Sequence, residues 1–373
     1  MEKNVKETYR MDSIIYKITD LVKQLILFTL CFNLTQCQQM KENDPKLAFQ
    51  VEICNPVGEY DVTPVYDLIK TLEGTHAGLP YGSSSGCWGD SGAIWTEQYG
   101  TPIGADITYY ADYEDTFYRL DVNFPIDTIK DYMERAYSRW DDLDGETKEY
   151  KRLGRGFTAS KSIPENAYDS FSDLVFGFAP KGMVVVWLRF GNTQIELGRY
   201  QAEILKDDKK LEERLFASWS MKRSEVRANY LIPNASPREW DNYRTRYNWR
   251  PIVVSANSKF RLFEILTYTY DGEKEGALRP WVLNMPYKKK AIPKEMVFTW
   301  ETGKEKQEQK NARVFFNWEE TNAVFEKAGS RIDMQVNIAE DNNSVEILLN
   351  GKALKTDSIR IYQWSGGYKE SYK

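Results

Sequence analysis

Residues 183–197 read MVVVWLRFGNTQIEL, and this stretch decides the fold class. Its first eight residues form an apolar run, which is typical of a strand buried on both faces. Gly191 and Asn192 then supply a tight turn, and residues 193–197 return with alternating apolar side chains. The stretch predicts a β-hairpin at the centre of a first sheet.

Two segments upstream of the hairpin repeat with a period of two. Residues 103–110 (IGADITYY) and 117–124 (FYRLDVNF) both place apolar side chains on alternate positions. That spacing indicates half-buried antiparallel strands. After Pro125 the period changes, and apolar residues from Ile126 to Trp140 recur at helical spacing. We therefore expect one amphipathic helix directly after the second strand.

A second β-rich region follows a charged, helix-prone stretch at 201–230 and a short aromatic and arginine-rich segment at 237–251. One further helix is expected at 319–327, between strands. The strand candidates of this region are 260–270, 296–300, 312–318, 332–338, 345–349 and 359–364. The sequence thus predicts an α+β fold, mostly antiparallel β with a few helices, in two β-rich parts at 48–251 and 252–373.

The N-terminal residues have the order of a bacterial lipoprotein signal. A short apolar run at 25–34 (LILFTLCFNL) is followed by Cys37 and then by a polar stretch. The run is about half the length that a membrane span requires. We expect a signal peptide at 1–36, a lipid chain on Cys37 and a tether at 37–47, with translation starting at Met1 or Met11. The alternative is a buried amphipathic helix.

Composition and charge exclude one class of partner. The chain is 42% hydrophobic and 28% charged, which is ordinary for a globular protein, and its formal net charge is −5. An acidic chain lacks the electrostatic footprint of a nucleic-acid binder. We expect contact with a membrane through the lipid anchor and no nucleic-acid partner.

Catalytic chemistry has little support in the sequence. The chain has one histidine, His76, whereas zinc sites and serine triads draw on histidine ligands or bases. The stretches 82–86 (GSSSG) and 89–92 (GDSG) imitate serine nucleophile motifs, but neither has a histidine where the corresponding fold requires one. We interpret both as turns and expect no metal and no cofactor.

Carboxylate chemistry is the remaining catalytic option. Asp112, Glu114 and Asp115 could contribute to a glycosidase pair, although they read as one solvated loop. A carboxylate-dependent hydrolase therefore stays open as an alternative, and we expect the chain not to be an enzyme.

Two cysteines remain in the region after the predicted anchor, Cys54 and Cys87. Export to an oxidising compartment would permit a disulfide between them. Two separate thiols are the alternative.

A glycine-rich segment at 78–92 is the candidate binding loop. Tyr81, Trp88 and Asp90 lie in it and Trp95 follows it, so the segment combines backbone freedom with side chains that commonly anchor interfaces. The alternative is an irregular connection whose aromatic residues pack onto the sheet.

Glycine and aromatic landmarks carry a family resemblance. They are 86–92 (GCWGDSG), the block 109–120 and 178–182 (FAPKG) leading into 184–188 (VVVWL). In this order they resemble the domain of unknown function 2931 family, over roughly residues 45–250. The resemblance implies a lipid-anchored protein of the Gram-negative cell envelope, at the outer membrane or the periplasmic face, and carries no activity. Members encoded near toxin-delivery systems suggest immunity lipoproteins.

Three functions are therefore open at this point. The first is a non-enzymatic module that binds a protein toxin or an envelope protein. The second is a glycan-binding or assembly accessory lipoprotein, for which the 14% aromatic content would suit stacking on sugars. The third is the hydrolase.

Overall fold

The computed structural model describes residues 48–56, 58–84, 87–90, 93–134, 170–190, 193–279, 281–303 and 308–364. The predicted signal peptide, the tether and Cys37 lie outside these residues. The described residues belong to one unit that begins at Leu47. Among their helices, none combines the length and the apolar composition that crossing a membrane requires.

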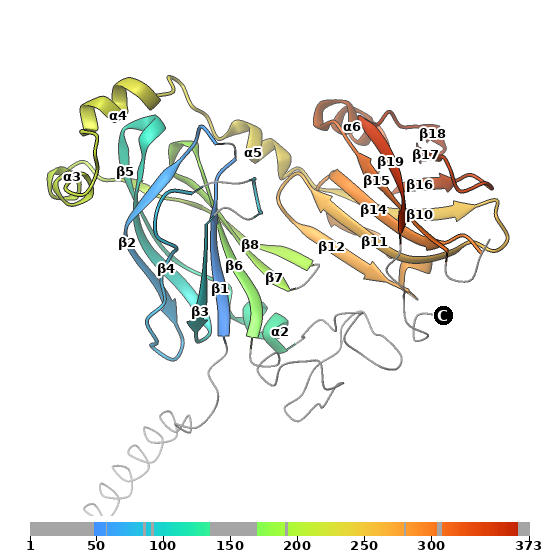
Figure 1. The fold of residues 1–373 in the computed structure, drawn as a ribbon, viewed down its shortest axis with the longest axis horizontal. Helices are drawn as coiled ribbons and strands as arrows, with labels where there is room; N and C mark the ends of the chain where they lie inside the picture. Colours follow the sequence, from blue (N-terminus) through green and yellow to red (C-terminus); the bar gives the residue numbers. More distant parts are fainter. Residues whose placement is uncertain are drawn as a thin grey trace, which may run out of the picture. The chain divides into compact units, whose positions relative to one another are not determined.

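Strands dominate the first part of the chain (Figure 1). They are β1 (Ala48–Cys54), β2 (Val62–Thr71), β3 (Ala93–Tyr99), β4 (Pro102–Ala111), β5 (Thr116–Asn123), β6 (Ser170–Ala179), β7 (Met183–Phe190), β8 (Thr193–Gln201) and β9 (Glu203–Ile204). The helices are η1 (Asp112–Glu114), α2 (Ile126–Glu134), η3 (Pro180–Gly182), α3 (Lys209–Phe216), α4 (Arg223–Tyr230) and α5 (Arg238–Tyr243).

The hairpin at 183–197 forms as predicted. Strands β7 and β8 pair antiparallel from Met183↔Gln201 to Phe190↔Thr193, with one register shift after Val186. β7 lies inside a ten-stranded sheet, between β6 and β8, and its run from Met183 to Leu188 is fully buried. The apolar run is therefore covered on both faces, as its composition requires.

A four-stranded sheet of order β2-β4-β5-β9 packs on those strands of the ten-stranded sheet that come from the first part of the chain. The two predicted alternating segments are β4 and β5, which pair antiparallel with Ile107 opposite Leu120. Their inward side chains share one core with β1, β6 and β7. The amphipathic helix predicted after Pro125 is α2, and residues 135–140 of that prediction lie outside the described range.

Helices α3 and α4 cover part of the outer face of the four-stranded sheet. Tyr110 and Phe117 point outward from β4 and β5 and are buried against Leu215 of α3 and Val226 of α4. The charged, helix-prone stretch at 201–230 thus forms short helices whose few apolar residues cover two rings. Without these helices the rings would be exposed to solvent.

The second β-rich part completes the ten-stranded sheet and adds a sheet of order β13-β10-β16-β17-β18. Its helices are η4 (Trp281–Leu283) and α6 (Trp318–Phe325), the latter at the predicted place. Its strands are β10 (Tyr247–Ser255), β11 (Arg261–Thr269), β12 (Lys274–Leu278), β13 (Lys288–Lys290), β14 (Pro293–Glu301), β15 (Gln309–Phe315), β16 (Ile332–Ile338), β17 (Val345–Leu349), β18 (Lys352–Ala353) and β19 (Ser358–Trp364). Side chains from both sheets form a second hydrophobic core. The fold is β-rich with mostly antiparallel sheets and few helices.

Residue 251, at which the sequence divides the chain, lies inside β10. Residues 249–255 of this strand pair in parallel with β16, so the strand belongs wholly to the second part. The ten-stranded sheet also continues from one part into the other, because Lys274 of β12 pairs with Gln194 of β8. The two cores are separate, but one sheet serves both.

Candidate functional site

The first half of the glycine-rich segment closes one side of the sandwich. We call residues 76–84 the closing segment; it runs between the edge strands β2 and β3. Ala77 pairs with Ile69, and the amide of Gly78 donates to Gln98 Oε1 at 3.1 Å. The amide of Leu79 donates to Asp67 Oδ2 at 2.5 Å, and Leu79 is buried. These contacts hold the closing segment against both sheets.

The candidate binding residues occupy very different environments. Tyr81 protrudes from the closing segment with 85% of its surface exposed. Asp90 is half exposed and forms ion pairs with Lys274 at 3.3 Å and Arg189 at 3.7 Å. Trp95 belongs to β3. The structure therefore exposes Tyr81 to solvent and holds Asp90 between two cations.

Trp88 is a core residue and not a surface anchor. Its ring meets the edge of Trp187 at 5.1 Å between centroids and lies 6.3 Å from Trp240. Its indole nitrogen is buried and has no hydrogen-bond partner among the described residues. For Trp88, the alternative of an aromatic residue packed onto the sheet is the one that the structure shows.

Gly89 lies where the loop meets the second part of the chain. Its φ of +75° is a left-handed conformation, and a Cβ there would lie 2.6 Å from Gly272 Cα. Gln194 Nε2 donates to the carbonyls of Gly89 at 2.6 Å and Gly272 at 2.5 Å. Only glycine permits this approach of two backbones, so Gly89 of the GCWGDSG landmark has a structural reason.

A buried charge cluster supports the same loop. Arg189 donates to Glu52 at 2.7 and 3.0 Å and to Asp173 at 3.0 Å. Burial raises the pKa of Glu52, although Arg189 opposes the shift. The same buried guanidinium also donates to the Gly89 carbonyl at 3.3 Å. Because it is shared by two carboxylates and this carbonyl, it fixes the position of Gly89 relative to β1, β6 and β7. This cluster therefore holds the loop in place.

The second landmark, FAPKG, also has a structural explanation. Lys181 and Gly182 both have positive φ, at 60° and 72°. A Cβ on Gly182 would lie 2.7 Å from the Ala202 carbonyl, and the amide of Lys181 donates to the Glu114 carboxylate at 3.1 Å. The landmark forms the tight connection between β6 and β7.

Cys54 and Cys87 are both free thiols in this structure, one buried and one exposed. Burial raises the pKa of the Cys54 thiol to about 12, so this sulfur is not a nucleophile near neutral pH. The arrangement is that of the separate-thiol alternative, with no bridge between the two residues.

Ser84 and His76, from the segments considered for catalysis, differ in their environments, and Ser91 lies outside the described residues. Ser84 is fully buried and its hydroxyl accepts a hydrogen bond from the amide of Val62 at 3.2 Å, so it is not an exposed nucleophile. His76 is exposed. No group of three or more metal-binding side chains occurs within the described ranges.

The interpretation of residues 112–115 as a solvated loop is wrong. The Glu114 side chain is only 4% exposed and contacts Lys181 Nζ at 3.1 Å. Asp115 pairs with Arg223 at 2.6 Å. Burial, with a contribution from Asp61, raises the pKa of Asp112 to about 6. These carboxylates are partly buried because η1 is enclosed by α4 and by the β6–β7 connection.

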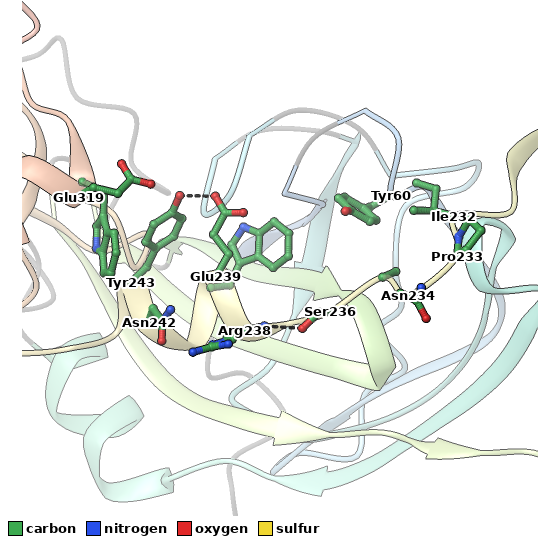
Figure 2. A pocket seen from close by; sticks show the side chains of 13 residues that line it. Tyr60, Ile232, Pro233, Asn234, Ser236, Arg238, Glu239, Asn242, Tyr243 and Glu319 are labelled. Atoms are coloured by element: carbon green, nitrogen blue, oxygen red, sulfur yellow. Dashed lines mark hydrogen bonds between the residues drawn. The ribbon is translucent and has the colours of Figure 1, made fainter.

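A pocket of about 570 Å³ lies elsewhere, along α5 (Figure 2). We call it the aromatic pocket, because four of its lining residues are Tyr60, Trp240, Tyr243 and Trp318. Its polar lining residues are Asn234, Ser236, Arg238, Glu239, Asn242 and Glu319, and Ile232, Pro233 and Ala235 complete the lining. The sequence indicated only that residues 237–251 are rich in aromatic and arginine side chains.

Comparison with known families gives one match. The sequence model described as "Protein of unknown function (DUF2931)" matches residues 36–234, which is more than half of the chain. Neither the curated proteins nor the solved structures include one that matches.

Proposed function

We propose that this chain, which belongs to the DUF2931 family, is a non-enzymatic binding module anchored at the cell envelope, and that its partner is a protein. The observation that supports this proposal is a concentration of exposed apolar side chains on the edge strands β2 and β3 and on the segment that connects them. We define the edge surface by its six residues, Tyr66, Leu68, Leu72, Tyr81, Ile94 and Tyr99.

The edge surface contains many exposed apolar residues for so short a stretch of chain. Six of the thirteen large apolar side chains that are exposed in the described ranges fall within residues 66–99, with exposed fractions from 39% to 85%. Isolated exposed apolar residues are normal, whereas a group of them indicates an interaction site. The group supports a protein partner, because aromatic and aliphatic anchors contribute most of the affinity in protein interfaces.

The strands that carry the edge surface add a second attraction. β2 and β3 are the terminal strands of their sheets in the described structure. A terminal strand offers backbone donors and acceptors to a partner, and the closing segment occupies only part of β2. Next to the apolar residues, the ion pairs Arg119–Asp106 and Lys70–Asp121 form a polar border.

The anchor gives the proposal its biological setting. A lipid chain on Cys37 would hold the edge surface at the envelope, where a delivered toxin must pass. Immunity to such a toxin is the form of the proposal that we favour. In that case the toxin gene lies beside the gene for this protein, and loss of this protein sensitises the cells.

The binding test uses substitutions in the edge surface. Leu68→Ser combined with Tyr81→Ala should weaken the complex with the neighbouring toxin at least about tenfold, since each hot-spot anchor contributes about 2 kcal/mol. Leu283→Ser is the matched control, because Leu283 is equally apolar and 57% exposed but lies in η4. Calorimetry on the purified proteins measures the affinity. Equal affinities for wild type, the double variant and the control would contradict the edge surface.

The anchor has a separate test. Cys37→Ala should abolish incorporation of labelled lipid and release the protein from the membrane fraction. Continued labelling of this variant would show that Cys37 is not the attachment site. Hydrolysis of glycans, lipids or peptides by the purified protein, lost on mutation of one carboxylate, would overturn the non-enzymatic proposal.

A further inference from the structure

The aromatic pocket carries two carboxylates that form no ion pair with the described residues. Glu239 belongs to α5 and Glu319 to the first turn of α6, eighty positions later in the chain. In the part of the chain that the structure describes, neither is within ion-pair distance of a lysine or arginine. Figure 2 shows the guanidinium of Arg238 pointing away from both carboxylates. The charged lining residues are thus two carboxylates and one guanidinium, so the pocket keeps a net negative formal charge.

Both carboxylates influence the hydroxyl group of Tyr243, which lines the same pocket. Its hydroxyl lies beside Glu239 in Figure 2 and donates a hydrogen bond to that carboxylate. Burial, then the hydrogen bond to Glu239 and the negative charges of Glu239 and Glu319, raises the pKa of this phenol. Both carboxylates are thus near enough to influence the same hydroxyl.

The rings supply the second half of a cation site. Trp318 meets Tyr243 at 5.4 Å and Tyr60 meets Trp240 at 5.6 Å between centroids, each pair in an edge-to-face arrangement. Tyr60, Tyr243 and Trp318 are half-buried, so part of each ring is open, whereas Trp240 is buried. Tryptophan and tyrosine faces attract ammonium and guanidinium groups. Rings and carboxylates together favour a ligand that is both cationic and partly apolar.

We propose that the aromatic pocket binds a basic side chain, lysine or arginine, presented by a protein partner. The alkyl stem of such a side chain would lie along the rings while its charged end meets Glu239 and Glu319. The volume of about 570 Å³ is ample for one such side chain. The proposal rests on the protein-binding function above but not on the edge surface.

The pocket also makes this binding depend on two distant segments. Residues 232–234 end the matched family region and residues 235–243 follow it, whereas Trp318 and Glu319 come from the second part. A basic side chain in the pocket would contact both. We therefore assign recognition of a positive group to the junction of the two segments.

The test measures the pocket directly with small probes. N-acetyl-lysine amide and N-acetyl-arginine amide are titrated into the full-length protein, and the indole N–H signal of Trp318, assigned with Trp318→Phe, is followed by NMR. N-acetyl-norleucine amide has the same apolar stem as lysine without its charge. We expect saturable shifts from the two basic amides and at least about tenfold weaker binding of norleucine.

Substitutions identify the carboxylates. Glu239→Gln and Glu319→Gln should each weaken lysine binding about threefold, and the double variant about tenfold. Glu213→Gln removes one negative charge from an exposed position on α3 and should leave the affinity unchanged. Circular dichroism confirms that each variant is folded, and Glu319→Gln leaves the Tyr243–Glu239 hydrogen bond intact.

The outcomes separate this inference from the proposed function. No saturable shift, equal binding of norleucine and lysine, or an unchanged double variant would each overturn the pocket proposal. If edge-surface variants lose the partner while the pocket fails these tests, the protein-binding function stands alone. If lysine binds as expected and no protein partner is found, only the pocket proposal is supported.

Discussion

Replacing Gly89 with alanine tests whether the contact between two backbones holds the loop. The new Cβ would lie 2.6 Å from Gly272 Cα, 2.9 Å from its carbonyl oxygen and 3.2 Å from Gln194 Nε2. The left-handed conformation of an alanine costs about 1–2 kcal/mol, and overpacking adds about 1–3 kcal/mol. We therefore expect Gly89→Ala to lower the free energy of unfolding by about 2–5 kcal/mol.

Gly74→Ala is the matched control for this prediction. Gly74 has a φ of +70°, and nothing lies within 4 Å of the position of its missing Cβ. It therefore carries the conformational cost without the collision, about 1–2 kcal/mol. Urea unfolding followed by tryptophan fluorescence measures both variants against wild type. If Gly89→Ala is no more destabilising than Gly74→Ala, the close approach to Gly272 is not what fixes the loop.

Two other predictions concern the core and the buried charges. Trp88→Ala should destabilise the protein by about 3–5 kcal/mol because the ring is buried against Trp187, whereas Tyr81→Ala should change stability by less than about 0.5 kcal/mol; equal effects in thermal unfolding would contradict this difference in burial. Burial, with the charge of Glu273, raises the pKa of Asp271 from 3.8 to about 7, although Arg246 at 3.1 Å opposes the shift. The folded state therefore holds this proton more tightly than the unfolded chain, so the stability that Asp271 contributes is present below about pH 4 and is lost as the pH rises through about 7. The stability of Asp271→Asn relative to wild type should rise between about pH 5 and about pH 8 in urea unfolding, and a constant difference would refute the shift.

Local patterns were enough to predict many elements. The hairpin at 183–197 and the strands β4 and β5 were predicted correctly because their side-chain periods depend only on which face is buried. The helices α2 and α6 were found for the same reason. The spacing of apolar residues indicates the buried face of a strand or helix, so it predicts the element without knowledge of the element that packs against it.

The candidate site was harder to predict. Trp88 and Tyr81 are seven residues apart in one glycine-rich segment, and the sequence offers both as candidate binding residues, with packing onto the sheet as the alternative. The structure buries one against Trp187 and leaves the other 85% exposed. The difference depends on Trp187 and Trp240, which cover Trp88 and lie about 100 and 150 residues later in the chain. No local pattern records those contacts.

By itself the sequence determined the β-rich class, the hairpin and the family landmarks. Those properties follow from side-chain period and from glycine's backbone freedom, which are local. Only the tertiary structure decided that one ten-stranded sheet serves both parts, that Glu114 is enclosed, and that Glu239 and Glu319 share a pocket. Each of these joins residues far apart in the chain, and chain distance alone does not fix which long-range pairs pack together.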